Sequence, residues 1–533
     1  MSDEPPDNSA GDTGPSSDTA GHSGERAVPD SDGNGPGGGD EPRNSITEGS
    51  LIGPLVQLAW PIVVIQLLQV AYNVVDTLYL GRLSADAVGA ISLAFPLIFL
   101  LISIGAGFTT AGAILVAQYT GAKGDRSAGL VAGQTVTFVS LLSVVIAVVG
   151  YFYTRPALEL LPTEPDTGAR VIPLAADYME VFFLGIPFLF GFFVFSALLR
   201  GYGDTRTPMY VMLLSVVANI LIDPVLIFGF ENNPLFGVVG LGAVEAALLG
   251  STGFTGFGIE GAALATIAAR GGASAVGLYL LFFTGSGPET RLEHLQPDLA
   301  FMRDIVRLGV PSMVENSANA LAQITLIAMI VTFSPPVVAA YGLGNRIVSL
   351  VFLPAMGLGR AIDTMVGQNL GADRADRATR SVYLAASTAA GVMVLVAVVA
   401  VVLTEPIVSV FLGDVPNAPE TITNGVEYVR IRAVEFAFIG ITQVLLGAFR
   451  GAGNTKTAMV ISVITLWVGR VGTVYLLVFV LGWGVRGVWV GMAVGNIVGT
   501  LVSIPWFLRG NWKTAYIDDV DEPAGVAERA GEN

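Results

Sequence analysis

The sequence predicts an all-α membrane protein with twelve transmembrane helices in two pseudo-symmetric six-helix lobes. Three observations support this fold class. Of the 533 residues, 53% are hydrophobic and only 13% are charged, whereas soluble domains carry about a quarter charged residues. The apolar residues form runs long enough to cross a bilayer, and the chain repeats itself at a fixed offset.

The apolar runs place the twelve helices. A membrane-crossing helix needs about 20 predominantly apolar residues. Six runs of this kind occupy the first half of the chain, at 54–81, 87–117, 129–153, 172–197, 208–230 and 258–284. Six more occupy the second half, at 304–333, 337–366, 379–403, 423–447, 458–482 and 485–508.

An internal repeat relates the two halves. VAQYTGA from Val116 matches VGQNLGA from Val366, and RGYGDTRTPM from Arg200 matches RGAGNTKTAM from Arg450, both at an offset of 250. Towards the end of each half the offset falls to 226, so the first half carries about 24 extra residues, in the loop around 231–256. Six spans per repeat preserve the topology, which predicts a parallel repeat about an axis along the membrane normal. Two such lobes suit alternating access.

Composition and the repeat divide the chain into five parts. We expect a disordered acidic tail at 1–50, a six-helix lobe at 51–285, a linker at 286–303, a second lobe at 304–510 and an acidic tail at 511–533. The first tail holds eleven acidic and two basic residues, and the last holds six acidic and two basic, so the tails carry most of the net charge of −16. Such polar, acidic stretches do not bury enough apolar surface to fold.

The basic residues of the short loops predict the orientation. With both termini in the cytoplasm, the inner segments hold fifteen Lys and Arg and the outer loops hold four, as the positive-inside rule requires. We therefore expect a multi-pass protein of the cell membrane with cytoplasmic termini. Acidic tails in a chain with 3 Lys and 24 Arg suggest a prokaryote adapted to high salt.

The composition excludes several function classes. The chain has no Cys, which removes disulfides, thiolate chemistry and iron–sulfur sites. It has only two His and no GxxxxGK[ST] motif, which argues against a His-based metal site and a P-loop ATPase. Its net charge is −16, which argues against nucleic acid as a partner. No nucleophile–base pair is evident, so we expect no enzyme and no cofactor other than a coupling ion.

Two carboxylates inside predicted spans stand out. Asp76 and Asp223 have Leu326 and Thr473 as their repeat counterparts, so neither acid recurs in the second lobe. A charge at mid-membrane costs about 2.5–3.5 kcal/mol and therefore needs its own reason.

Three further polar residues fall at the same expected depth as these acids: Asn219, Tyr178 and Thr266. Asn219 precedes Asp223 by one turn and lies on the same helix face. The oxygen-rich cluster could bind a hard monovalent cation or share a proton. The alternative is a polar network that only locks the lobe together.

Other polar residues of the spans are candidates for a substrate cavity. Gln69, Tyr72 and Asn73 form one stripe with Asp76, which must face protein or water. In the second lobe the acids that break the repeat symmetry are Glu315, opposite Ile65, and Glu435, opposite Gly185. Arg360 and Asp363, three residues apart, are expected to form a structural ion pair.

Several segments together resemble the multidrug and toxic compound extrusion (MATE) family, in its DinF-like prokaryotic branch. They include YNVVDTLYLG, VAQYTGAK, RGYGDTRTPM and NILIDPVLIFG, and the resemblance covers about residues 50–510. It implies an antiporter, driven by Na+ or H+, that exports small amphipathic organic cations across the bilayer. We expect the protein to be a monomer. In that branch the coupling site maps onto Asp76, Asn219, Asp223, Tyr178 and Thr266. Na+ would be held by Asp76, Asn219, Asp223 and Thr266.

Two alternatives remain open. A flippase for lipid-linked oligosaccharides would need a basic cavity, which Arg346, Arg360 and Arg470 could provide. A passive channel or a membrane enzyme is the other alternative, although Pro residues within the spans favour a carrier with kinked helices.

Overall fold

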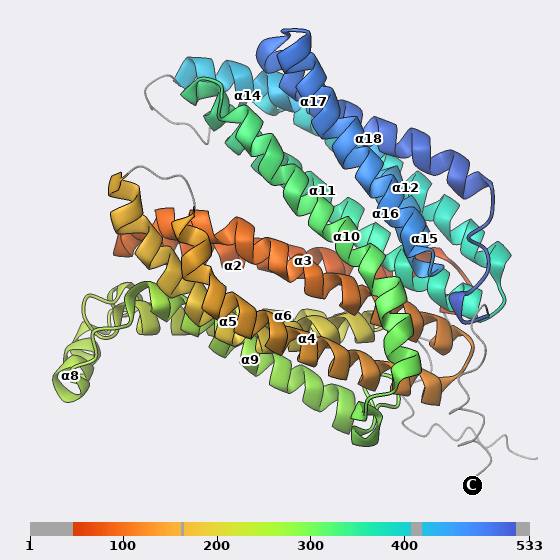
Figure 1. Cartoon of the computed structure of the whole chain (residues 1–533), viewed down its shortest axis with the longest axis horizontal. Coiled ribbons are helices and arrows are strands. Elements are labelled where there is room, and N and C mark those ends of the chain that lie inside the picture. Colours follow the sequence, from red (N-terminus) through yellow and green to blue (C-terminus); the bar gives the residue numbers. More distant parts are fainter. Residues whose placement is uncertain (1–45, 161–164, 407–417, 519–533) are drawn as a thin grey trace, which may run out of the picture. The chain divides into compact units, whose positions relative to one another are not determined.

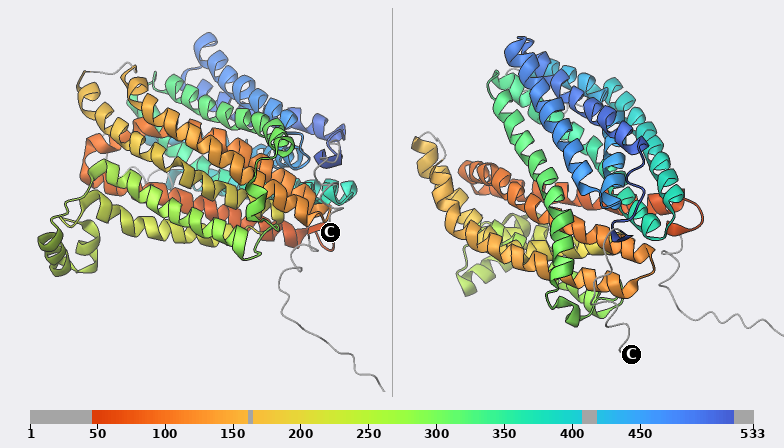
Figure 2. Two further views of the ribbon diagram at one scale, coloured as in Figure 1. Left: turned by 60° about the horizontal axis from the view of Figure 1, so that its bottom comes forward. Right: turned by 45° about the vertical axis from the view of Figure 1, so that its right-hand side comes forward.

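The computed structural model describes residues 46–160, 165–406 and 418–518, and in these ranges it contains helices and turns but no strand. The first lobe holds α2 (Ile52–Leu83), α3 (Ala85–Gly121), α4 (Asp125–Glu159), α5 (Pro165–Tyr202), α6 (Arg206–Phe228), α7 (Pro234–Val239), α8 (Gly242–Thr252) and α9 (Gly258–Phe283). After η1 (Leu292–Leu295), the second lobe holds α10 (Leu299–Ile330), α11 (Pro335–Gly371), α12 (Ala375–Val402), α14 (Ala418–Ala433), α15 (Phe436–Gly451), α16 (Thr455–Val463), η2 (Ile464–Gly472), α17 (Thr473–Tyr475), η3 (Leu476–Val480) and α18 (Gly484–Leu508), and η4 (Tyr516–Asp518) follows. Figures 1 and 2 show the long helices of each lobe side by side, the first lobe in red to light green and the second in green to blue.

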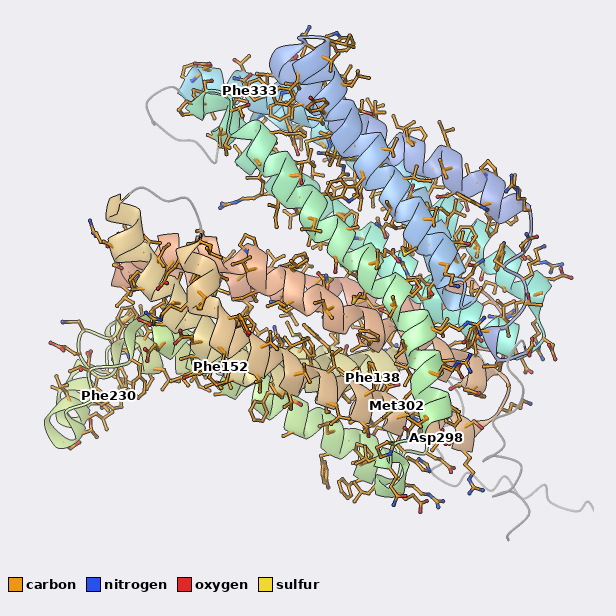
Figure 3. All side chains as sticks on the ribbon, in the orientation of Figure 1. Phe138, Phe152, Phe230, Asp298, Met302 and Phe333 are labelled. Atoms are coloured by element: carbon orange, nitrogen blue, oxygen red, sulfur yellow. The ribbon has the colours of Figure 1, made fainter. Side chains whose placement is uncertain are left out.

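Each of the twelve predicted spans coincides with a helix or a run of consecutive helices. Within the described residues, ten helices are long and apolar enough to cross a membrane, and α14 with α15, bent by 49°, pass together as an eleventh span. The remaining predicted span is α10, whose 32 residues include charges such as Arg303, Arg307 and Glu315. Figure 3 shows that α10 runs from Asp298, which caps its first turn, towards Phe333.

The structure reproduces the repeat in the backbone as well as in the sequence. Lys123 and Asp373, 250 residues apart, both adopt the left-handed conformation, with φ of 59° and 57°. Gly203 and Gly453, also 250 residues apart, have φ of 108° and 78°, values that favour glycine because it has no Cβ. The repeated motifs thus form equivalent turns at the ends of equivalent helices.

The lobes contact each other through α2 and α3 on one side and α10 and α11 on the other. Glycine permits the closest approach. A Cβ at Gly121 would lie 2.0 Å from the carbonyl oxygen of Gln368, and a Cβ at Gly371 would lie 2.0 Å from that of Gln118. Small residues at helix crossings bring backbones together in this way in membrane proteins.

The linker between the lobes is anchored to α4. Gln134 donates to the carbonyls of His294 (2.8 Å) and Gln296 (2.6 Å) and accepts from the backbone of Asp298 (2.8 Å). His294 is buried, and this burial lowers the pKa of its imidazole. The linker is therefore a packed connection.

The ends of the described chain also pack on the helices. Ile46 is buried, and Arg377 donates to its carbonyl oxygen, so residues 46–50 of the expected tail lie against the second lobe. Trp512 and Ala515 of the expected C-terminal tail are buried. The remainder of both tails, 1–45 and 519–533, lies outside the described residues. The extra loop at 231–256 contains the short helices α7 and α8.

Candidate functional site

Two polar side chains of α6, Asn219 and Asp223, are fully buried inside the first lobe. They lie one turn apart, and Asn219 Nδ2 donates to Asp223 Oδ1 at 3.1 Å. α6 packs closely against α9 because Gly261 of α9 has no side chain. A Cβ at Gly261 would lie 2.2 Å from the carbonyl oxygen of Leu226 on α6. Burying an ionised carboxylate is costly unless it is paired, so Asp223 needs further partners.

One of those partners comes from α2, which packs against α6. The carboxyl groups of Asp76 and Asp223 are close enough for one to donate a hydrogen bond to the other when it is protonated, and Tyr72 interacts with Asp76 from the preceding turn. Two carboxylates that share a site repel each other when both are ionised. A proton or a cation between them removes that repulsion.

Phenol and hydroxyl groups of neighbouring side chains lie around the carboxyl groups of Asp76 and Asp223. Tyr72 forms a short hydrogen bond with Thr266 of α9, which joins α2 to α9. Tyr178 of α5 is buried and lies within electrostatic reach of both Asp76 and Asp223. We call the six residues Asp76, Tyr72, Asn219, Asp223, Tyr178 and Thr266 the first-lobe cluster. The five residues predicted for ion coupling therefore lie together, and their role in coupling stays a prediction.

Three oxygens of the first-lobe cluster lack a hydrogen-bond donor among the described residues. They are Asp76 Oδ1, Asn219 Oδ1 and Asp223 Oδ2, and all three are buried. A buried acceptor without a donor costs about 1–3 kcal/mol, and carboxylate and amide oxygens suit hard cations. The described residues contain no group of three or more His, Cys, Asp or Glu that could hold a metal.

Arg270 is a member of this region that the sequence interpretation missed. It lies on α9, is 2% exposed, donates to Gln69 Oε1 at 2.6 Å and sits 5.1 Å above the centre of the Tyr72 ring. Its charge also acts on Asp76. An Arg within the predicted span 258–284 was the available signal. It lacks a repeated partner, because its counterpart at offset 226 is Asn496.

The polar stripe of α2 leads from the cluster to a cavity. Gln69 donates to Asn73 Oδ1 at 3.2 Å and lines a cavity of about 240 Å³, together with residues of α3, α5, α6 and α11. Tyr72 and Asn73 do not line it. Of the three stripe residues predicted for a substrate cavity, one therefore lies on its wall.

The two second-lobe acids predicted for a substrate cavity, Glu315 and Glu435, lie in ion pairs. Glu315 accepts from Arg450 Nη1 at 2.7 Å, and Arg450 also contacts Asp363 at 3.3 Å. Glu435 is fully buried between Arg432, its ion-pair partner, and Asn496 Nδ2 at 2.7 Å. Neither acid lines the cavity, and their predicted role at a substrate site stays untested. The expected pair of Arg360 and Asp363 is present at 3.3 Å.

Two six-helix repeats, a polar cluster buried within one of them and a cavity beside it define a membrane carrier. The MatE family model matches the chain twice, over residues 61–225 and 311–476, and the two matches begin 250 residues apart. The chain therefore belongs to the MATE family of multidrug efflux transporters. It is a multi-pass membrane transporter for small molecules and not an enzyme.

Individual relatives agree with this assignment. The chain is 30% identical to the probable multidrug resistance protein YoeA of Bacillus subtilis, over 86% of this chain and 93% of that protein. It is 26% identical to the probable multidrug resistance protein NorM of Thermotoga maritima, over 86% and 92% of the two chains. Its fold matches the structure of a MOP superfamily transporter from Pyrococcus furiosus with a TM-score of 0.77 at 22% identity, over 89% and 99%.

Proposed function

We propose that this transporter is an antiporter in which Na+ or H+, bound at the first-lobe cluster, drives the export of small amphipathic molecules. The observation that carries the proposal is the set of three buried oxygens without donors, Asp76 Oδ1, Asn219 Oδ1 and Asp223 Oδ2. A polar network that only held the first lobe together would give each of its buried acceptors a hydrogen-bond donor, because a buried acceptor without a donor is costly. Bound Na+ or H+ would satisfy them.

Binding at this cluster would act on the contact between the lobes. Asp76 lies on α2, and α2 also packs against α11 of the second lobe, where Gly357 lies close to Val63. Ionised Asp76 and Asp223 repel each other, so a bound cation draws α2 towards α6. A ligand with different affinities for two conformations shifts the equilibrium between them, and substrate and cation then compete through linked free energies.

Alternating access requires one end of the lobe interface to close while the other opens. The end at which α3 and α11 terminate is closed in this structure, where Gly121 and Gly371 bring the two backbones together. We propose that this end faces the cytoplasm, because fifteen of the loop Lys and Arg belong to the side that carries both termini. The structure then represents a state closed to the cytoplasm.

Vesicles with an imposed gradient test the coupling proposal. Purified protein in liposomes is given a Na+ gradient or a pH gradient separately, and ethidium, an organic cation of the predicted kind, is followed by fluorescence. We expect one gradient to drive ethidium uptake in the wild type, and Asp76→Asn or Asp223→Asn to abolish it.

A matched control keeps this test specific. Asp177→Asn removes a carboxylate next to Tyr178 in the sequence, but Asp177 points to the exposed Arg155 at 3.0 Å, so this variant should keep gradient-driven transport. Gradient-driven transport that survives either Asp76→Asn or Asp223→Asn would show that the proposed coupling site is wrong.

We further propose that the protein acts as a monomer, because the internal repeat supplies both six-helix lobes of the carrier within one chain. The origin in a cell adapted to high salt rests on the acidic tails and the excess of Arg over Lys, and stays a prediction. The predicted positive charge of the substrate finds no carboxylate among the described residues that line the cavity.

A further inference from the structure

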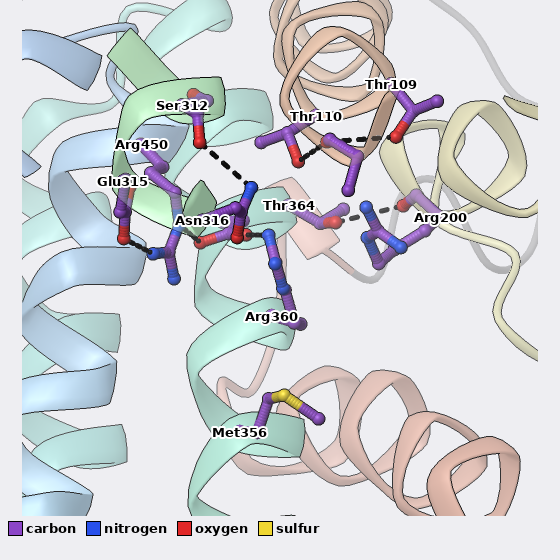
Figure 4. A network of polar contacts seen from close by, with 12 residues as sticks. Thr109, Thr110, Arg200, Ser312, Glu315, Asn316, Met356, Arg360, Thr364 and Arg450 are labelled. Carbon is purple, nitrogen blue, oxygen red and sulfur yellow. Dashed lines mark hydrogen bonds and ion pairs between the residues drawn. The ribbon is translucent and has the colours of Figure 1, made fainter. Parts of the chain in front are cut away.

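The repeat offers an internal comparison of two equivalent arginines. Arg200 and Arg450 begin the two copies of the RGxG motif, 250 residues apart. Arg450 is held by two acids, Glu315 at 2.7 Å and Asp363 at 3.3 Å. Figure 4 shows the ion pair of Arg450 with Glu315. The second lobe thus neutralises its own copy of this arginine.

The first lobe lacks the groups that would neutralise Arg200. The counterparts of Glu315 and Asp363 at offset 250 are Ile65 and Ala113. The contact drawn at Arg200 in Figure 4 runs from Thr364 Oγ1 to its main-chain oxygen at 2.9 Å. Among the ion pairs of the described residues, none includes the Arg200 side chain.

The position that an acid occupies in the second lobe is held in the first lobe by an apolar residue, Ile65, which lines a cavity. Ser462 donates to Glu315 at 3.1 Å, and the counterpart of Ser462 is Met212. Ile65, Met212 and Arg200 all line the 240 Å³ cavity. Where the second lobe packs Glu315, Arg450 and Ser462 against each other, the first lobe therefore leaves a cavity with an unpaired arginine in its wall.

A second arginine strengthens the positive charge of this cavity. Arg360 reaches its wall from α11 and is 24% exposed, while its single acidic partner, Asp363, is shared with Arg450. Arg200 lies within electrostatic range of Arg360, Arg450 and Asp363. Three guanidinium groups thus face two carboxylates in this region. Of the described residues that line the cavity, two are Arg and none is Asp or Glu.

The rest of the lining suits a flat apolar body. Phe192, Phe193, Ile62, Ile102 and Met356 contribute apolar surface, and Gln66 and Gln69 contribute amides. Planar guanidinium groups match carboxylate and phosphate geometry, and a charge-assisted hydrogen bond is stronger than a neutral one.

We propose that this cavity binds the anionic group, a carboxylate or a phosphate, of an amphipathic small molecule, with Arg200 and Arg360 as its partners. The ligand's anion takes the place that Glu315 occupies beside Arg450. This inference rests on the proposed transport function for its physiological meaning, but the binding step needs no ion gradient and is tested separately.

Equilibrium binding to the full-length protein in phosphatidylcholine nanodiscs tests the proposal. Fluorescence anisotropy is measured with carboxyfluorescein, which is anionic, and with ethidium, which is cationic. We expect carboxyfluorescein to bind, Arg200→Gln to weaken it at least about tenfold, and Arg200→Lys to weaken it less. Arg206→Gln removes an exposed positive charge six residues away and should leave the affinity unchanged. Asp76→Asn should still bind the dye, because Asp76 does not line the cavity. A failure of the coupling proposal can therefore be distinguished from a failure of the anion-binding proposal.

Three results would overturn the proposal. Equal affinity of Arg200→Gln and the wild type would show that Arg200 is not a partner. Displacement of the dye by inorganic phosphate at an equal concentration would mean that the site recognises a bare anion only. Displacement by phosphatidylglycerol introduced into the nanodisc would identify the anion as a lipid headgroup and exclude a dissolved small molecule.

Discussion

Gln118 and Gln368 occupy equivalent positions in the two lobes, and each donates a side-chain hydrogen bond to the opposite lobe. Gln118 Nε2 reaches the carbonyl oxygen of Gly451 at 2.9 Å, and Gln368 Nε2 reaches that of Gly201 at 2.9 Å. Both amides are buried. Two copies of one motif therefore fasten the lobes together at the end where α3 and α11 terminate.

We predict that Gln118→Ala and Gln368→Ala loosen this closed end. Each substitution leaves a buried carbonyl without its donor, at a cost of about 1–3 kcal/mol. The effect of Gln118→Ala should be larger, because Gln118 Oε1 also accepts from the backbone of Tyr516 at 2.8 Å. The chain has no Cys, so a single Ala117→Cys, at a buried position, can report opening by its rate of maleimide labelling. Unchanged labelling in both variants would contradict a role for these amides in closure.

We predict that Gly121→Ala opens the same end by a steric route. A Cβ at this position would lie 2.0 Å from the carbonyl oxygen of Gln368, so the lobes must separate or the helices must shift. Labelling of Ala117→Cys should accelerate, and gradient-driven transport should fall. Gly391→Ala is the matched control, since a Cβ there meets nothing within 4 Å. If Gly121→Ala behaves like Gly391→Ala, the close approach of Gly121 to Gln368 is not needed for closure or for transport.

We predict that Arg270→Met strengthens binding of the coupling cation. Arg270 is buried and its positive charge acts on Asp76, so its removal takes away a repulsion felt by any cation at the first-lobe cluster. The apparent affinity for Na+ or H+ in the vesicle assay should rise, while thermal stability falls because Gln69 loses its 2.6 Å donor. A variant with unchanged cation affinity would show that Arg270 only supports packing.

We predict unequal costs for two second-lobe glutamates. Glu435→Ala leaves Arg432 buried without its acid and should destabilise the protein by about 3–5 kcal/mol. Glu427→Ala breaks a pair with Arg486, whose side chain is 75% exposed, and exposed pairs contribute about 0.2–1 kcal/mol. Thermal unfolding of the two variants in one detergent measures the difference. Similar losses would show that the buried pair of Arg432 and Glu435 contributes no more to stability than the exposed pair of Arg486 and Glu427.

We predict that mild acid weakens the packing of the linker. Burial lowers the pKa of His294, so below the ordinary value of about 6.5 the unfolded chain takes up a proton that the folded linker does not. Stability is then full above that pH and declines as the pH falls below it. The unfolding temperature should drop between pH 7 and pH 5, and His294→Gln should reduce this drop. An equal drop in the variant would assign the pH dependence to other groups.

Sequence periodicity was sufficient for the helices and for the repeat. The runs of about 20 apolar residues coincide with the observed spans, and the matched motifs at 116 and 366 form equivalent turns. The two acids of the first-lobe cluster could also be predicted from the sequence, because Asp76 and Asp223 are carboxylates inside spans and have no acidic counterpart in the second lobe. Both signals are local or depend on a fixed offset, and neither needs knowledge of how helices pack.

The pair of Arg360 and Asp363 lies within one helix and was predicted, but the partners that charged side chains find on other helices depend on packing and could not be predicted in this way. Arg450 lies on α15, yet its acids lie on α10 and α11. Arg270 of α9 meets Gln69 of α2.

The sequence by itself determined twelve spans, their pairing into two lobes and the acids that occur in only one of them. Hydrophobic runs and repeats are properties of the order of residues alone, and each span must satisfy its own backbone hydrogen bonds. Only the tertiary structure decided that Arg450 is neutralised while Arg200 faces a cavity. Helices that are distant in sequence bring those side chains together, and the balance of charge in a buried space depends on which groups meet there.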